Sequence, residues 1–257
     1  LDEFVAKRLK DYEMNRNNPS VLGTSRLSGA LARGLLSPRQ CVRAAEHALN
    51  LPIWEFPNHA FSWINELIWR DFYQHLLVGF PKLSKNKAFR PETESLRWRN
   101  DPSDIDAWKN GRTGIPIVDA GMRELVATGW MHNRVRMVVA QFLTKNLLCD
   151  WRIGETHFME YLVDSDLGSN NGGWQWSAST GTDAAPYFRV FNPVSQGETH
   201  DPNADYVTQF IPELASVPVK RRHSPWTATL PDRYPAPIVD LKSSRQRAID
   251  AFKELKS

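Results

Sequence analysis

Two tryptophans, Trp174 and Trp176, lie two residues apart in a segment otherwise made mostly of Gly, Ser, Thr and Asn, residues 170–183. Little apolar sequence surrounds these indoles, so the segment is poor material for a hydrophobic core. An indole pair on a polar frame suits a site where flat rings or redox chemistry meet the protein. We therefore expect residues 170–183 to line such a site.

A second group of aromatic and charged residues recurs at helical spacing. The residues are three, four or seven positions apart and share one side of a helix: Trp63, Glu66, Trp69, Arg70 and Tyr73. Spacing alone favours an amphipathic stripe with an i,i+4 ion pair between Glu66 and Arg70. The other interpretation is a pocket wall, in which indoles stack on flat rings and Glu66 bonds to a ring N–H, because a carboxylate among indoles needs a partner.

A third group lies on one face of a predicted helix and consists of Asn133, Arg136 and Met137, with Arg134 about a quarter turn away. A capping Asn, solvated arginines and a core Met would explain the same pattern without a ligand. The sequence alone leaves both interpretations open.

A phosphate-binding pattern is found near the N-terminus, where Tyr12 and Arg16 precede a run of hydroxyl residues, 24–28. Hydroxyls and free backbone N–H groups at a helix start bind anions, although such residues also serve as simple caps. The chain has no Walker A sequence, no HExxH or other metal spacing, and no GxSxG elbow. We therefore predict neither a metal site nor a serine hydrolase.

The elements that position these residues are predicted to be helices, which gives an all-α fold. Ser37, Pro38 and Gln40 form a capping box, and Gly129 ends a helix. No convincing period-two strand is present, and the proline-rich residues 192–237 are interpreted as a long irregular excursion. The expected helices are 1–12, one starting at 37, 59–80, 116–128, 132–149, 155–163 and 243–256.

Composition indicates a globular protein of 257 residues with 24% charged residues and a net charge of +3, which permits nucleic acid as a partner. No apolar run is long enough to cross a bilayer. Two cysteines, Cys41 and Cys149, provide no disulfide framework, so we expect a reducing, cytoplasmic location. The chain starts at Leu1 inside a helical pattern, which we interpret as part of a longer protein.

Four segments together resemble the FAD-binding domain of DNA photolyases and cryptochromes, most closely the class I photolyases that repair cyclobutane pyrimidine dimers. They are residues 63–73 (WINELIWRDFY), 129–137 (GWMHNRVRM), 170–176 (NNGGWQW) and 182–193 (TDAAPYFRVFNP). The resemblance extends over the chain in order. It implies that residues 1–257 are one helical catalytic domain, without the N-terminal α/β domain that holds a folate or deazaflavin antenna pigment in this family.

The resemblance implies an FAD, reduced in the active state, within the helical domain. Arg136 and Asp164 would form a salt bridge beside the flavin ring, and Asn170 would face flavin N5. The residues that would hold FAD are Tyr12, Thr24, Ser25, Arg26, Leu27, Ser28, Trp63, Glu66, Arg70, Asn133, Arg136, Asp164, Asp166 and Asn170.

It further implies light-driven repair of pyrimidine dimers in DNA by a monomeric lyase, with electron transfer from FAD to a dimer flipped out of the duplex. The catalytic residues would be Glu66, Asn133, Met137 and Asn170. The dimer and the surrounding DNA would contact Arg16, Glu66, Trp69, Asn133, Arg134, Met137, Trp176, Arg189 and Gln196. Trp98, Trp151 and Trp174 match the indoles that carry electrons to oxidised flavin.

Family relatives with other functions remain as alternatives. The main one is a cryptochrome, a photoreceptor that signals through partners. Plant cryptochromes carry Asp and insect light-sensing ones carry Cys at the position of Asn170, which favours repair for this chain. Repair of (6-4) photoproducts uses two histidines where this chain has Asn133 and Met137. The iron–sulfur branch needs four cysteine ligands, and the chain has two cysteines.

Overall fold

A computed structural model describes residues 1–228 and 230–255, and in this part of the chain it contains helices and loops but no strands. The all-α prediction is therefore confirmed. The α-helices are α1 (Asp2–Lys7), α2 (Tyr12–Asn15), α3 (Ser28–Ala32), α4 (Pro38–Leu49), α5 (Asn58–Gly79), α6 (Pro102–Lys109), α7 (Pro116–Thr128), α8 (Asn133–Gln141), α9 (Trp151–Tyr161), α10 (Leu167–Ala178), α11 (Pro193–His200), α12 (Asp205–Phe210) and α13 (Leu241–Glu254).

Shorter turns complete the architecture. A π turn, η5 (Phe142–Asn146), directly follows α8. The 3-10 helices are η1 (Leu9–Asp11), η2 (Ile53–Glu55), η3 (Pro81–Lys85), η4 (Pro91–Ser95), η6 (Pro212–Ser216), η7 (Val219–Arg221) and η8 (Pro225–Thr227).

Local signals in the sequence set several helix ends. The side chain of Ser37 accepts from the Gln40 backbone at 3.3 Å, while the Gln40 side chain accepts from the Ser37 backbone at 2.8 Å, so the predicted capping box is confirmed. Gly129 ends α7 with a φ of 69°, the left-handed conformation that glycine adopts without steric cost.

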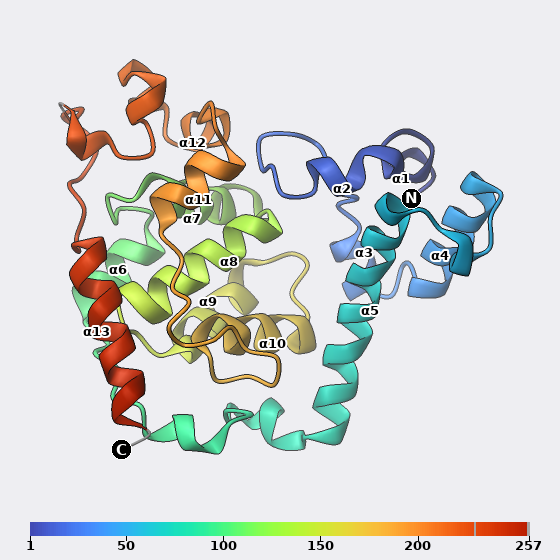
Figure 1. Ribbon diagram of the computed structural model, residues 1–257, viewed down its shortest axis with the longest axis horizontal. Helices are drawn as coiled ribbons and strands as arrows, with labels where there is room; N and C mark the ends of the chain where they lie inside the picture. The colour runs from blue at the N-terminus through green and yellow to red at the C-terminus, as the bar shows by residue number, and fades with distance from the viewer. Residues whose placement is uncertain (229, 256–257) are drawn as a thin grey trace.

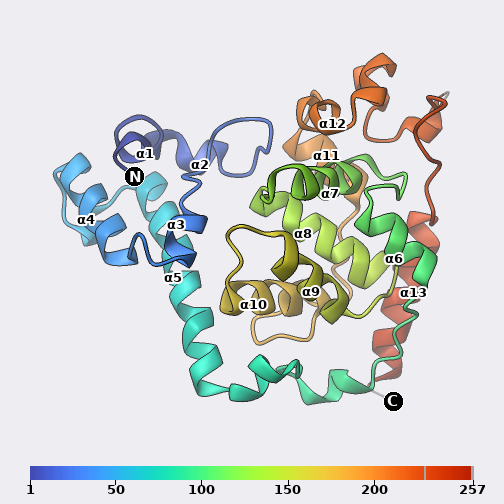
Figure 2. The ribbon, with the colours of Figure 1, turned by 180° about the vertical axis from the view of Figure 1, so that it is seen from behind.

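The helices pack into two hydrophobic clusters. One is built from α1 to α5 and includes Phe4, Tyr12 and Trp63, and the other is built from α6 to α13 and includes Trp108, Trp151 and Trp174. Figure 1 shows α1 to α5 on one side and α6 to α13 on the other, joined by the segment that follows α5. Seen from behind in Figure 2, α10 again lies between α9 and α5. This arrangement brings α5 and α10 to the boundary between the clusters.

The expectation that residues 170–183 make poor core material is wrong for the first indole. Residues 167–178 form α10, and Trp174 is only 2% exposed. Two glycines allow this close packing. A Cβ on Gly154 would lie 2.0 Å from the Trp174 ring, and one on Gly172 would lie 2.1 Å from the Tyr73 ring. Apolar partners from α5 and α9, distant in sequence, bury the polar-looking helix.

The irregular excursion expected over residues 192–237 is also partly wrong, because it contains α11 and α12. Asn192 caps α11 by accepting from the Val194 backbone at 3.0 Å, and Pro193 occupies the first helical position. Thr229 and Lys256 lie outside the described residues, so the predicted end of the last helix at Lys256 is untested.

Other predicted helix limits also differ. The helix expected over 1–12 is divided into α1, η1 and α2, and the one expected over 132–149 ends at Gln141, before the π turn. The helix expected over 155–163 starts four residues earlier, at Trp151, where Asp150 caps it. Within the described ranges no helix is long and apolar enough to span a membrane, and no three His, Cys, Asp or Glu residues gather as a metal site.

Candidate functional site

A cavity of about 250 Å³ opens between the N-terminal helices and the α8–α10 region. It gathers side chains from α2, α3, α5, α8 and α10, from the loop before α3 and from the segment before α10, and its outermost residues, Tyr12 and Ser169, are 157 positions apart in the chain. Its predicted cofactor residues are Tyr12, Thr24, Ser25, Ser28, Trp63, Glu66, Arg70, Asn133, Arg136, Asp164 and Asp166. The structure thus brings together most of the residues expected to hold FAD.

Hydroxyl groups concentrate at one end of this cavity. The side-chain hydroxyls of Thr24 and Ser28 have no hydrogen-bond partner within the described part of the protein, so they are free to bind a ligand. Arg70 lies nearby, with its guanidinium 3.2 Å from the Leu31 carbonyl and 3.3 Å from Asp166. Free hydroxyls beside a guanidinium form a donor set suited to phosphate.

A second cavity of about 140 Å³ adjoins the first, since Asn133, Arg136, Asp164, Asp166 and Ser169 line both. Apolar and flat side chains form much of its wall: Met137, Ala140, Phe158, Leu162 and Trp174. The joined cavities fall in the usual size range of small-molecule sites, roughly 300–1,000 Å³. The combination of a donor-rich end and an apolar, flat-walled end fits an elongated ligand with a phosphate part and a ring part.

The ion pair expected between Arg136 and Asp164 lies where the two cavities meet. The Arg136 guanidinium donates to both carboxylate oxygens, at 2.9 and 3.1 Å, and also to the Met131 carbonyl at 2.7 Å. The Asp164 side chain is only 2% exposed. Because a charged pair this buried is held by several hydrogen bonds, its position in the cavity wall is fixed.

Asn170 lines the second cavity, and its side-chain amide donates to the Glu155 carbonyl at 2.9 Å. The neighbouring Asn171 donates to the Glu155 carboxyl at 3.0 Å, and burial raises the pKa of that carboxyl. Asp166 caps α10 through the Ser169 backbone at 2.9 Å and accepts from Gln74. These bonds orient α10 and the residues it presents to the cavity.

The i,i+4 ion pair expected between Glu66 and Arg70 is wrong. Glu66 instead pairs with Arg16 at 2.5 Å, and Arg70 pairs with Asp166. The Arg16 guanidinium also lies 5.3 Å from the Tyr12 ring centre. Burial, followed by the nearby Glu66 carboxylate, raises the pKa of Tyr12 to about 12, so its phenol stays protonated at neutral pH.

Asn133 and Met137 lie one turn apart, with the Asn133 amide nitrogen 3.9 Å from the Met137 sulfur. Both line the second cavity, which confirms that they share a face with Arg136. Arg134 points elsewhere and donates to Asn17 at 2.7 Å. Burial and the nearby Arg134 lower the pKa of His132 to about 4, so the neutral imidazole can accept from the Arg134 backbone and cap α8.

Other predicted contact residues lie outside these two cavities. Trp69 is 37% exposed, Arg189 is exposed, and Gln196 is half-buried. Trp176 lines a small neighbouring hollow with Tyr73 and Asp183. Arg26 and Leu27 do not line either cavity, since the Arg26 guanidinium lies 4.4 Å over Trp130 and Leu27 packs on the N-terminal cluster.

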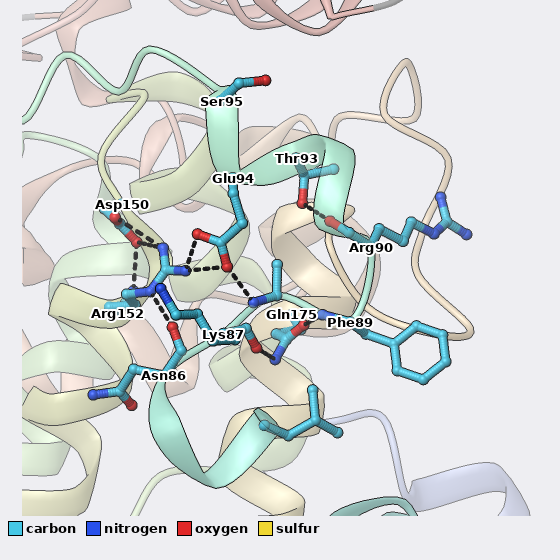
Figure 3. A network of polar contacts seen from close by, with 12 residues as sticks. Asn86, Lys87, Phe89, Arg90, Thr93, Glu94, Ser95, Asp150, Arg152 and Gln175 are labelled. Atoms are coloured by element: carbon cyan, nitrogen blue, oxygen red, sulfur yellow. Dashed lines mark hydrogen bonds and ion pairs between the residues drawn. The ribbon is translucent and has the colours of Figure 1, made fainter. Parts of the chain in front are cut away.

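The three predicted electron-transfer indoles belong to one hydrophobic cluster, with Trp151 and Trp174 buried in it and Trp98 packed against it. Trp174 lines the second cavity, and its ring packs on Gly154, one turn after Trp151 in α9. Trp98 precedes Arg99, whose backbone donates to Leu148 at 2.7 Å, just before α9. Figure 3 shows the Arg152 guanidinium bonded to Asp150 and Glu94. Arg152 also lies 4.7 Å over the Trp151 ring and so helps to fix that ring.

Sequence reasoning did not single out the small residues of α10 that line the second cavity, although it expected residues 170–183 to line a site. Ser169, Gly173 and Ser177 line the second cavity at i,i+4 spacing, on the helix side that faces α8. This row of small residues is a sequence signal, because small side chains on one face of a helix leave room for a ligand or another helix. The row was not recognised because no helix was expected over these residues, which form α10.

Comparison with known proteins assigns the family. A family model for the FAD binding domain of DNA photolyase matches residues 63–254. The chain belongs to this family. It is 49% identical to the deoxyribodipyrimidine photo-lyase of Escherichia coli K12, over 98% of the chain and 54% of that protein. The chain thus spans about half the length of the curated relatives it matches.

Solved structures of the family are also similar. A bacterial class III photolyase from Agrobacterium tumefaciens superposes with a TM-score of 0.93 at 43% identity, covering 99% of this chain and 54% of that one. A cryptochrome from Synechocystis superposes with a TM-score of 0.84 at 34% identity, covering 97% and 53%. The solved structures similar to this chain therefore include both a photolyase and a cryptochrome.

Proposed function

We propose that this chain binds FAD in the two joined cavities. Three features support the fit: the unpartnered hydroxyls of Thr24 and Ser28 for phosphate, the Arg136–Asp164 pair, and the flat wall formed by Trp174. The phosphates would lie at the hydroxyl end and the flavin ring beside Asn170. Tyr12, Trp63 and Arg70 would close the first cavity around the remainder of the cofactor.

Replacing Asp164 with Ala is expected to weaken FAD retention. The substitution leaves the Arg136 guanidinium without its carboxylate, and an unsatisfied polar group of this kind costs about 1–3 kcal/mol. The flavin content of the purified protein and its release on dilution measure the effect. Asp71→Ala, an exposed carboxylate on α5, serves as the matched control and should retain FAD normally. Equal flavin retention in both variants would contradict the assigned role of the ion pair.

We further propose that the protein repairs cyclobutane pyrimidine dimers in light. The observation that carries this proposal is that Glu66, Asn133 and Met137 line the same joined cavities as the residues that would hold FAD. When bound in its reduced form, FAD supplies the photoexcited electron that breaks the cyclobutane ring. Asn133, which lines both cavities, can donate to a base carbonyl, and Met137 offers an apolar contact.

Damaged DNA is the proposed partner, with the dimer flipped out of the stack into the cavity. Arg134 and the exposed Arg189 can contact phosphates around it, and Gln196 can donate to the backbone or a base. Trp69 and Trp176 would flank the entry of the dimer. Because such arginines release counterions when they bind phosphates, affinity for dimer-containing DNA should fall as salt rises.

The test uses matched oligonucleotides that carry either a cyclobutane thymine dimer or a (6-4) photoproduct. Illuminated protein with reduced FAD should cleave the first and leave the second intact, since neither Asn133 nor Met137 can act as a general acid for (6-4) repair. Product is measured by chromatography, with dark samples as controls. Repair of the (6-4) product would overturn the roles given to Asn133 and Met137.

A photoreceptor function is the second candidate, supported by the similarity to the Synechocystis cryptochrome. The same assay separates the two functions. A sample that holds reduced FAD and binds dimer-containing DNA but cleaves no dimer under light would favour the photoreceptor.

A further inference from the structure

A chain of aromatic contacts leads away from Trp174 in a direction not used by Trp151 and Trp98. Trp174 meets Trp108 edge-to-face, with ring centres 6.1 Å apart. Trp108 then meets His157 at 5.5 Å, and His157 meets Tyr161 at 4.5 Å. Trp108 is fully buried, whereas Tyr161 is 44% exposed. The contacts therefore connect the cavity wall to the protein surface without a gap.

We infer that Trp108, His157 and Tyr161 form a second route by which electrons from the surface reach Trp174. This inference rests on the proposed binding of FAD beside Trp174. The first route would leave through Trp151, the first residue of α9, while the second would leave through Tyr161, the last residue of the same helix. Trp151 and Tyr161 are ten positions apart in this helix, so the two exits lie roughly 15 Å apart along its axis.

The surroundings of the second route can accommodate a positive charge, although the Lys109 ammonium, next to Trp108 in sequence, opposes it. The Trp108 indole donates to the Val139 carbonyl at 3.2 Å, and this oxygen stabilises a transient cation on the indole. Burial, followed by the nearby Lys109, lowers the pKa of His157 to about 4, so the bridging imidazole is neutral at pH 7 and adds no opposing charge. Tyr161 lies at the negative end of the α9 dipole.

The first route also has positive charge beside its middle indole. Trp151 starts α9, at the positive end of the helix dipole, and the Arg152 guanidinium lies 4.7 Å from its ring. Both features oppose oxidation of Trp151, although Asp150 and Glu94 partly offset the charge of Arg152. Electron transfer from Trp108 to an oxidised Trp174 would therefore have a driving force comparable to that of electron transfer from Trp151.

On this route the electron that reaches FAD comes from a thiol in solution. Trp174 gives one electron to illuminated, oxidised FAD, Trp108 gives one to Trp174, and Tyr161 gives one to Trp108 across the His157 contact. Tyr161 releases its phenolic proton to water, because the ring is solvent-exposed. A thiol in solution then transfers a hydrogen atom to the phenoxyl oxygen, which restores Tyr161 and leaves a thiyl radical. The net result is one electron from the thiol to the cofactor.

The experiment illuminates flavin-loaded protein with a thiol and follows flavin reduction by absorbance. Trp151→Phe, which interrupts the first route, should retain part of the photoreduction. Adding Tyr161→Phe should remove that remainder, whereas adding Tyr187→Phe, a tyrosine that packs on Phe252 and lines neither cavity, should not. Tyr161→Phe alone, reduced chemically beforehand, should repair dimers at the parental rate, since Tyr161 lies outside both cavities.

A second measurement does not depend on the folding of the Trp151 variant. The parental protein is illuminated with a nitroso spin trap in place of the thiol, and adducts are located by mass spectrometry. An adduct on Tyr161 that is lost in Trp174→Phe supports the second route. Adducts elsewhere with none on Tyr161, or a double variant that photoreduces like Trp151→Phe, would overturn it.

The outcomes also separate this inference from the proposed function. Protein that traps a radical on Tyr161 but repairs no dimer would overturn the repair function and leave the second route standing. Protein that repairs dimers but never traps a radical on Tyr161 would overturn only the second route. Protein that carries no flavin would overturn both.

Discussion

Trp174→Phe is expected to abolish light-driven reduction of oxidised FAD and to leave repair by chemically reduced protein intact. Trp174 lines the flat-walled cavity, and both proposed electron routes would enter the cavity through it. Phenylalanine fills much of the same space but is far harder to oxidise, so packing is largely kept while the electron donor is lost. This prediction has the largest effect because it removes a step shared by both routes.

The measurement compares flavin absorbance under light with dimer cleavage after reduction by dithionite. Trp54→Phe, an indole that is 80% exposed, is the matched control and should photoreduce at the parental rate. Photoreduction by Trp174→Phe at the parental rate would show that electrons enter elsewhere. Loss of repair in the pre-reduced variant would instead show that Trp174 acts on the substrate directly.

Sequence patterns predicted best where the cause is local. The capping box at Ser37, the stop at Gly129 and the shared face of Asn133, Arg136 and Met137 follow from residues within one or two helical turns. The joined cavities depend on contacts between distant segments. The Arg136–Asp164 pair spans 28 residues, and only the family resemblance pointed to it.

The errors have the same physical origin. Spacing suggested Arg70 as the partner of Glu66, but the fold places Arg16, 50 residues away, against that carboxylate. A Gly- and Ser-rich segment suggested poor core material, yet Gly154 lets α9 approach the Trp174 ring, which is buried, and Gly172 lets Tyr73 of α5 approach α10. The proline-rich residues 192–237 suggested an irregular excursion, yet Pro193 begins α11. Composition could not reveal these outcomes, because each depends on which distant element packs against the segment.

The partner found for Glu66 also sharpens its expected role in repair. A carboxylate paired with Arg16 at 2.5 Å carries its negative charge and can accept a hydrogen bond from a base N–H, while the adjacent guanidinium offsets the negative charge that the dimer gains. Arg16, predicted to contact the surrounding DNA, lines neither cavity itself but pairs with Glu66, which lines the first. Glu66 and Arg16 are expected to work as one unit.

Glu66→Ala is accordingly expected to slow dimer repair by pre-reduced protein roughly 10- to 100-fold, the equivalent of about 1.5–3 kcal/mol for a hydrogen bond to a charged group. Glu66→Gln keeps an acceptor oxygen without the charge, so its repair rate should lie between those of the parental protein and Glu66→Ala. Repair is followed as the rate of dimer cleavage under saturating light, with flavin content checked in each variant. Glu13→Ala, an exposed carboxylate on the same short helix as Tyr12, should repair at the parental rate. If Glu66→Ala retains FAD and repairs as fast as that control, Glu66 does not contact the dimer, and the pair with Arg16 only fixes α2 against α5.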